Sequence, residues 1–132
     1  MQESDDIRSE PRGELELRTV AMPRNTNPSG DIFGGWIMSL MDLAAGLAGT
    51  NRANGRVVTA AISQLAFLAP VKVGDAVCCY AELVRLGRTS LTYNIEAWAL
   101  LHRLQGARHK VTEAQFTMVA VDENGRPRPL SG

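Results

Sequence analysis

Cysteine, histidine and net charge are all scarce in this sequence. Among 132 residues there are two histidines and two cysteines, and the cysteines are adjacent at Cys78 and Cys79. Adjacent cysteines rarely bridge each other and no second pair is present, so neither a disulfide framework nor a metal site is expected. Fourteen basic residues balance fourteen acidic ones, so no overall field attracts nucleic acid or an anionic membrane. Aromatic residues make up only 5% of the chain, which argues against a stacking platform for single strands.

Signals for export or membrane insertion are missing as well. The amino terminus, MQESDDIRSEPR, is polar and acidic, unlike a secretory signal, and we interpret residues 1–12 as a disordered tail. The longest apolar run, 32–48, contains Asp42 and several glycines, and a charge is costly within a membrane span. We therefore expect a cytoplasmic protein with one folded domain over 13–132.

The order of the predicted elements is typical of an α+β fold. A turn-rich segment, PRNTNPSGD (23–31), precedes a long apolar helix that starts near Gly34 and ends within NRANG (51–55). Period-two patterns predict strands at 14–22, 56–70, 76–86, 89–101 and 109–122. Their short connections predict an antiparallel sheet with the helix across one face. Because a single helix leaves the sheet edges uncovered, self-association is expected.

Asp42 is the only charged residue between Ile32 and Thr50. On a wheel of about 100° per residue, small residues share its side: Gly35, Ser39, Gly46 and Gly49. The opposite side is apolar and is predicted to face the core: Ile37, Leu40, Ala44 and Leu47. A lone carboxylate there is either solvated or bonded to nearby backbone, or it is a candidate general base. The residues alone favour neither interpretation.

Longer motifs carry a resemblance to a known family. The chain resembles the YciA-type acyl-CoA thioesterases in six segments that occur in consistent order: NTNPSGDIFGGWIMSLMD (25–42), GRVVT (55–59), FLAPVKVGDAVCCY (67–80), GRTS (87–90), TEAQFTMVAVD (112–122) and GRPR (125–128). The resemblance spans 14–128 and implies the hotdog fold, a long helix wrapped by a curved antiparallel sheet. It also implies hydrolysis of acyl-CoA without a cofactor, in homodimers that commonly assemble as trimers of dimers.

The resemblance assigns catalytic roles around the helix start. Asp42 corresponds to the family's catalytic aspartate, which acts as a general base on water or attacks the thioester directly. Asn27 corresponds to the asparagine that positions the water or the carbonyl. Gly34 and Gly35 correspond to a glycine pair whose backbone N–H polarises the thioester oxygen, helped by the helix dipole. Related two-domain thioesterases draw the aspartate and asparagine from opposite hotdog units, which implies a site shared between two subunits.

Contacts with CoA are predicted at basic and hydroxyl positions. Arg88, Thr89 and Ser90 lie in GRTS, where the arginine suits a phosphate contact and equally suits an ordinary exposed hairpin. Arg56 and Lys72 are similar candidates with weaker support.

A second group of predicted substrate contacts lies nearer the helix. It comprises Phe33, Met38 and Thr59, with Met38 bordering the Asp42 side of the helix. The chain also departs from its relatives at Ala69, where they often carry arginine or lysine. If that cation binds CoA phosphate in the relatives, either the affinity for CoA is lower here or another residue supplies the contact.

Two rival functions are weighed against hydrolysis. A hotdog dehydratase would place a histidine before the helix, where this chain has Phe33, and His102 and His109 flank a later hairpin loop instead. A non-hydrolytic acyl-CoA-binding module or regulator would need neither Asp42 nor Asn27, and the presence of both favours an enzyme.

Overall fold

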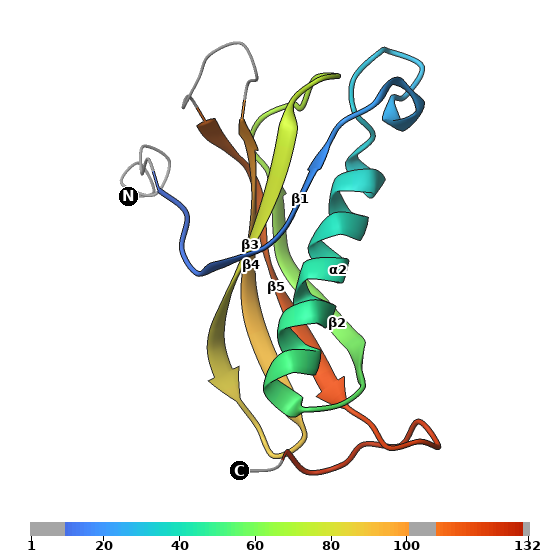
Figure 1. Cartoon of the computed structure of the whole chain (residues 1–132), viewed down its shortest axis with the longest axis vertical. Helices are drawn as coiled ribbons and strands as arrows, with labels where there is room; N and C mark the ends of the chain where they lie inside the picture. The colour runs from blue at the N-terminus through green and yellow to red at the C-terminus, as the bar shows by residue number, and fades with distance from the viewer. Residues whose placement is uncertain (1–9, 101–107, 131–132) are drawn as a thin grey trace.

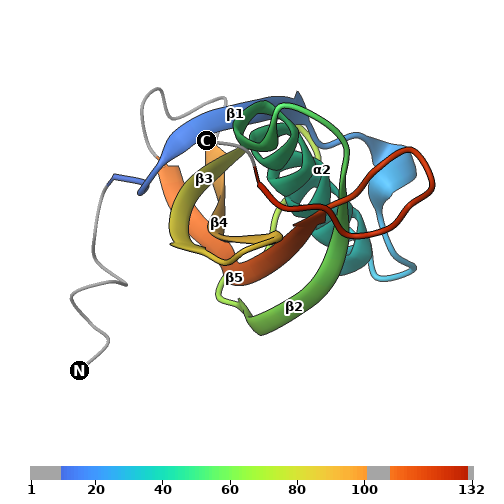
Figure 2. The same cartoon turned by 90° about the horizontal axis from the view of Figure 1, so that it is seen from below.

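The computed structural model describes residues 10–100 and 108–130, and within them it places one long helix against a five-stranded antiparallel sheet. The elements in chain order are β1 (Glu14–Val20), η1 (Pro23–Asn25), α2 (Gly34–Ala53), β2 (Val57–Phe67), β3 (Ala76–Leu86), β4 (Ser90–Leu100) and β5 (Arg108–Ala120). The spatial strand order is β1-β3-β4-β5-β2. Figure 1 shows α2 lying along one face of the sheet, and Figure 2 shows the sheet curving around it.

This arrangement confirms the predicted α+β fold and its hotdog architecture. The predicted strand at 76–86 has the observed bounds, whereas the strand predicted at 56–70 ends at Phe67, before the turn that contains Pro70. The helix ends as its sequence indicates, because Asn54 adopts a left-handed φ of 56° and its N–H bonds the Thr50 carbonyl. His102 and most of the predicted tail over 1–12 lie outside the described residues.

Small side chains bring α2 close to the sheet. The helix buries mainly alanines and two larger residues against the sheet: Ile37, Met41, Ala44, Ala45, Ala48 and Ala53. Opposite them lie buried residues of β4 and β5, among them Leu91, Ile95, Phe116 and Met118. The Tyr93 hydroxyl donates to the Ala48 carbonyl over 3.1 Å, which ties the middle of the sheet to the helix backbone.

The buried face of α2 differs from the predicted one. Leu47, predicted to face the core, is 45% exposed, while Met41 and Ala45 are fully buried. The curved sheet covers one flank of the helix only, and this flank is rotated toward Asp42, which lies at its border and is half-buried. Leu43 and Leu47 are therefore left on an uncovered apolar strip, which a single chain does not bury.

Cys78 and Cys79 are adjacent residues of β3, and successive side chains of a strand point to opposite faces of the sheet. They do lie on opposite faces of β3, but both are buried, since Cys79 belongs to the core beneath α2 and Cys78 is only 6% exposed on the other face. Burial raises the pKa of the Cys79 thiol to about 12. This thiol therefore stays protonated at neutral pH and behaves as a small apolar side chain.

β2 forms one edge of the sheet and is distorted along its length. It pairs only with β5, with irregularities between Thr59 and Ala61 and between Ser63 and Ala66. Within the second irregularity, Gln64 has a φ of 58°, a left-handed conformation that costs an L-residue roughly 1–2 kcal/mol. The Gln64 side chain is exposed, so the strain is not offset by packing.

Replacing Gln64 by glycine should therefore stabilise the protein. We expect Gln64→Gly to raise the free energy of unfolding by about 0.5–1 kcal/mol, because the left-handed strain exceeds the extra chain entropy of glycine. Urea denaturation of both proteins measures the change. Gln64→Ala removes the same exposed side chain but keeps the strain, so a gain of equal size in that variant would contradict the explanation.

Candidate functional site

A cavity of about 500 Å³ lies at the amino end of α2, beneath the loop that leads into it. It is lined by Arg24, Asn25, Thr26, Asn27, Pro28, Phe33, Gly35 and Trp36. The loop is held by backbone bonds, including Phe33 N–H to the Asn25 carbonyl (2.7 Å) and Ile32 N–H to the Val71 carbonyl (3.2 Å). Three residues predicted from sequence, Asn27, Phe33 and Gly35, thus line one cavity.

The side-chain amide of Asn27 uses its oxygen, but not its nitrogen, in hydrogen bonds with the described residues. Its Oδ1 accepts hydrogen bonds from the backbone N–H groups of Ser29 (2.9 Å) and Asp31 (3.1 Å). Two donors converging on one atom identify that atom as the oxygen. The Nδ2 group has no hydrogen-bond partner within the described part of the chain. Asn27 can therefore act on a ligand as a donor, which suits a carbonyl oxygen or the lone pair of a water.

The glycine pair supplies backbone donors. Helix α2 begins at Gly34, its amino-terminal cap Phe33 gives no side-chain hydrogen bond, and its first internal bond comes from the N–H of Trp36. The N–H groups of Gly34 and Gly35 thus belong to the unpaired first turn of a helix, where the dipole favours negative charge. A Cβ on Gly35 would lie 2.9 Å from the Phe33 ring, so glycine keeps this approach open.

Among the described residues, Asp42 has one side-chain hydrogen-bond partner, and it comes from another element. The Thr59 hydroxyl on β2 donates to Asp42 Oδ1 over 2.5 Å, across 17 residues of sequence. The carboxylate is therefore neither isolated nor bonded to nearby backbone, and its second oxygen remains available. Thr59 was predicted as a substrate contact, and here it lies against the carboxylate.

Within one chain, Asp42 lies away from the cavity that Asn27 and Gly35 line. Asp42 follows Gly35 by seven residues on the same helix, which separates them by about 10 Å at 1.5 Å per residue. A reacting carbonyl would have to lie about 3 Å from both groups. One subunit thus presents the two halves of the predicted site separately.

Lys72 lies at the loop rather than at an open binding surface. Its Nζ contacts Asp31 Oδ1 at 2.8 Å, and this hydrogen bond is the main cause that raises the pKa of Lys72. Because Asp31 ends the turn that Asn27 caps, the pair ties the loop to residues 71–75.

Apart from Met38, the remaining predicted substrate contacts of this group lie at the other end of the helix. Arg88 and Thr89 lie in the β3–β4 turn and Ser90 begins β4, and this turn lies at the same end of the molecule as the carboxyl end of α2 in Figure 1. Arg56 is exposed just after that helix end, and Met38 is half-buried on the first turns. One chain does not bring the turn residues to the cavity.

The cavity also contains residues that sequence reasoning missed. Arg24 is exposed on η1 and has no side-chain partner among the described residues, and Asn25 and Trp36 complete the wall. Only the proximity of Arg24 to Asn27 in the sequence could have indicated it. Its guanidinium is a cation suited to phosphate, and Arg24 lines the cavity, whereas Ala69 offers no charge.

Among residues 10–100 and 108–130, no three or more histidine, cysteine, aspartate or glutamate side chains gather where they could hold a metal ion. The same residues include no helix long and apolar enough to cross a membrane.

Comparison with known proteins gives consistent matches. The thioesterase superfamily matches residues 29–104. The acyl-CoA thioester hydrolase YciA of Salmonella typhimurium is 53% identical over 122 residues, covering 91% of this chain and 92% of that protein. A hexameric thioesterase from Yersinia pestis has a TM-score of 0.87 at 51% identity, over 93% of this chain and 99% of that one. A hexameric hotdog fold thioesterase of Campylobacter jejuni has a TM-score of 0.86 at 40% identity, over 92% and 93%.

Proposed function

The chain belongs to the thioesterase superfamily and is an acyl-CoA thioester hydrolase, and from this premise we propose that Asp42, Asn27 and the start of α2 hydrolyse the thioester. The observation that carries the proposal is that Asn27 and Gly35 line the same cavity: the Asn27 oxygen is bonded within the loop, which leaves its Nδ2 for a ligand, and the Gly35 N–H belongs to the first turn of α2. Two donors converging there suit an oxyanion.

The chemistry follows from these groups. The Gly35 N–H and the Asn27 amide donate to the thioester oxygen, on which negative charge develops as the carbonyl is attacked. Asp42 takes a proton from a water whose oxygen forms the new bond to carbon, the C–S bond breaks, and the proton passes to the leaving sulfur. Direct attack by the carboxylate, followed by hydrolysis of an anhydride, is the alternative. Neither route uses a cofactor, since CoA is part of the substrate.

The aspartate comes from a second subunit. The free edge of β2 and the exposed residues Leu43 and Leu47 offer hydrogen bonds and apolar area to another copy. Antiparallel pairing about a two-fold axis runs the two helices in opposite directions, so that Asp42 of one copy approaches Asn27 and Gly35 of the other. We place the active sites at this homodimer interface, with a trimer of dimers as the complete assembly.

The same symmetry gathers the CoA contacts. The turn formed by Arg88, Thr89 and Ser90 lies at the carboxyl end of α2, so in an antiparallel dimer it approaches the partner's cavity. Arg24 then supplies the phosphate contact from the cavity's own chain, in place of a cation at Ala69. Phe33 and Trp36 form the apolar wall against the pantetheine or acyl chain.

Release of free CoA thiol tests the function directly. The purified protein is incubated with short, medium, long and aromatic acyl-CoAs, and the thiol is measured with a chromogenic reagent. Hydrolysis of at least one substrate is expected. Tight binding of every acyl-CoA without thiol release would instead identify a non-hydrolytic binding module.

The contact between Thr59 and Asp42 gives a prediction about rate. Thr59→Val keeps the side-chain shape but removes the hydrogen bond that orients the carboxylate, so kcat should fall about 10- to 100-fold while KM stays unchanged. Thr59→Ser keeps the hydroxyl and should restore most of the rate. Steady-state kinetics on one acyl-CoA separate this role from a direct substrate contact, which would raise KM.

A further inference from the structure

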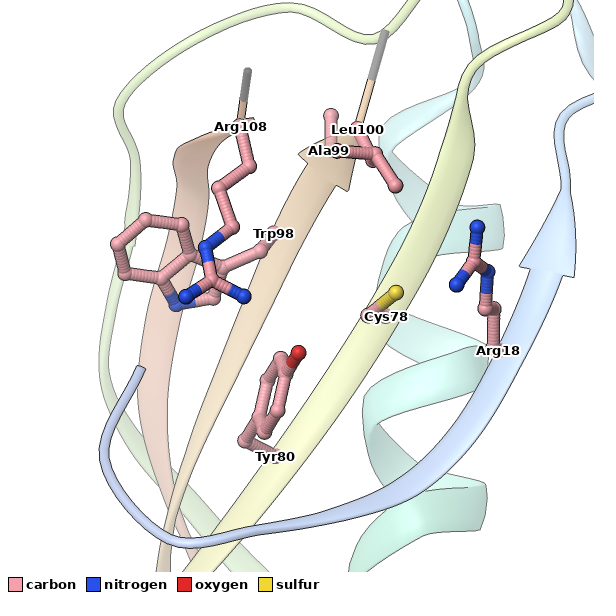
Figure 3. A pocket seen from close by; sticks show the side chains of 7 residues that line it. All are labelled: Arg18, Cys78, Tyr80, Trp98, Ala99, Leu100 and Arg108. Atoms are coloured by element: carbon pink, nitrogen blue, oxygen red, sulfur yellow. The ribbon is translucent and has the colours of Figure 1, made fainter. Parts of the chain in front are cut away.

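The face of the sheet opposite α2 carries a second cavity, which the proposed active site does not use. It measures about 190 Å³ and is lined by Arg18, Cys78, Tyr80, Trp98, Ala99, Leu100 and Arg108. Figure 3 shows the Arg18 and Arg108 guanidinium groups on either side of Cys78, with the Tyr80 hydroxyl pointing toward the space between them. Four strands contribute to it, so the fold and not one local loop builds it.

Strand register places these residues together. Arg18 on β1 lies opposite Cys78 on β3, and Cys78 lies opposite Trp98 on β4. Arg108 at the start of β5 lies opposite Leu100, and its Cζ is 5.9 Å from the centre of the Trp98 ring. This cation–π contact lies over a floor formed by Cys78 and Trp98, which are 6% and 2% exposed.

The charged side chains that line this cavity are all positive. The two arginines are positive, and none of the seven lining residues is a carboxylate. Burial raises the pKa of the Cys78 thiol and of the Tyr80 hydroxyl, so both groups are neutral at neutral pH, and hydrogen bonds join Tyr80 to Arg108 and to Cys78. The nearest row on this face contains Glu96, which accepts hydrogen bonds from Trp98 Nε1 (2.9 Å) and from the Arg12 backbone N–H (3.2 Å).

We propose that this cavity, between Arg18 and Arg108 on the outer face of the sheet, binds a phosphate group. Two guanidinium groups on either side of one space, with no carboxylate among the lining residues and a neutral hydroxyl and thiol between them, match a tetrahedral oxyanion. Its volume lies below the roughly 300 Å³ of small-molecule sites, so the cavity holds the phosphate itself, and any larger molecule would extend into solvent. The site is independent of hydrolysis, because α2 and Asp42 lie on the other face.

Titration with inorganic phosphate tests the site. Calorimetry and thermal unfolding are measured at constant ionic strength, with chloride as the reference anion. Wild-type protein should bind phosphate and unfold at a higher temperature, and Arg18→Gln should weaken binding at least about 10-fold, as expected for a lost bidentate contact. Arg18→Lys keeps the charge without the fork and should lie between the two. Arg126→Gln, which removes an exposed turn arginine, should change nothing.

Three results would overturn the proposal. These are a wild-type response to phosphate no larger than that to chloride, an equal loss of binding in Arg126→Gln, or a loss that occurs in Arg24→Gln but not in Arg18→Gln. The last would assign the phosphate to the cavity at the helix start. Adenosine 3′,5′-bisphosphate serves as a second ligand. If Arg18→Gln weakens the binding of phosphate and of the bisphosphate equally, the phosphate group is the element that the cavity recognises. If the wild type binds the bisphosphate more tightly than phosphate, a nucleotide is the source of that group. Unchanged hydrolysis by Arg18→Gln in phosphate-free buffer separates this site from the catalytic one.

Discussion

Asp42→Asn should lower the rate of acyl-CoA hydrolysis at least about 100-fold, the usual contribution of a positioned general base. The asparagine oxygen can still accept the hydrogen bond from Thr59, so the local structure is kept. Its amide cannot take a proton from water or attack a thioester, so only the chemical step is lost. Thiol release under saturating substrate measures kcat.

Two controls limit the interpretation of that loss. Asp122→Asn changes another carboxylate that accepts backbone hydrogen bonds, from Asn124 and Arg126 in the final turn, and it should leave the rate unchanged. Binding of a non-hydrolysable thioether analogue of acyl-CoA to Asp42→Asn should match the wild type. Equal kcat values for Asp42→Asn and wild type would refute the assignment of the base, whichever way the analogue binds.

Local signals explain why the elements could be predicted from the sequence. The left-handed Asn54 before Gly55 ends α2 where the NRANG segment predicts it, and the period-two pattern predicts β3 at 76–86. The helical wheel placed Leu47 on the buried side, but Leu47 is exposed. A wheel uses only the sequence of the helix, whereas the flank of α2 that is buried depends on how the sheet curves. That curvature is a property of the whole sheet.

Contacts across the sheet explain what could not be predicted. Thr59 reaches Asp42 only because β2 lies beside the helix in a particular register, and the row from Arg18 to Trp98 exists only because three strands align. The periodic pattern of a strand does not predict register shifts at bulges such as the one around Gln64. The roles of Asn27 and Gly35 were predicted from the family resemblance, and the structure adds that both residues line one cavity.

Mixing two inactive variants should restore activity if the site is shared between subunits. Asp42→Asn removes the base. Asn27→Asp keeps the oxygen that holds the loop but replaces the free amide donor with a negative oxygen facing the developing oxyanion, so this variant should lose about 10²–10³ in rate. Each homodimer then has two defective sites.

Co-expression with two affinity tags gives the decisive comparison. In a mixed dimer, one shared site carries both substitutions and the other carries neither. Random pairing makes half of the dimers mixed, so the population should recover about a quarter of the wild-type rate, and purified mixed dimers about half. If Asp42 and Asn27 acted within one chain, every site would keep one lesion and no recovery would occur. The separation of about 10 Å between Gly35 and Asp42 along α2 is the reason to expect recovery.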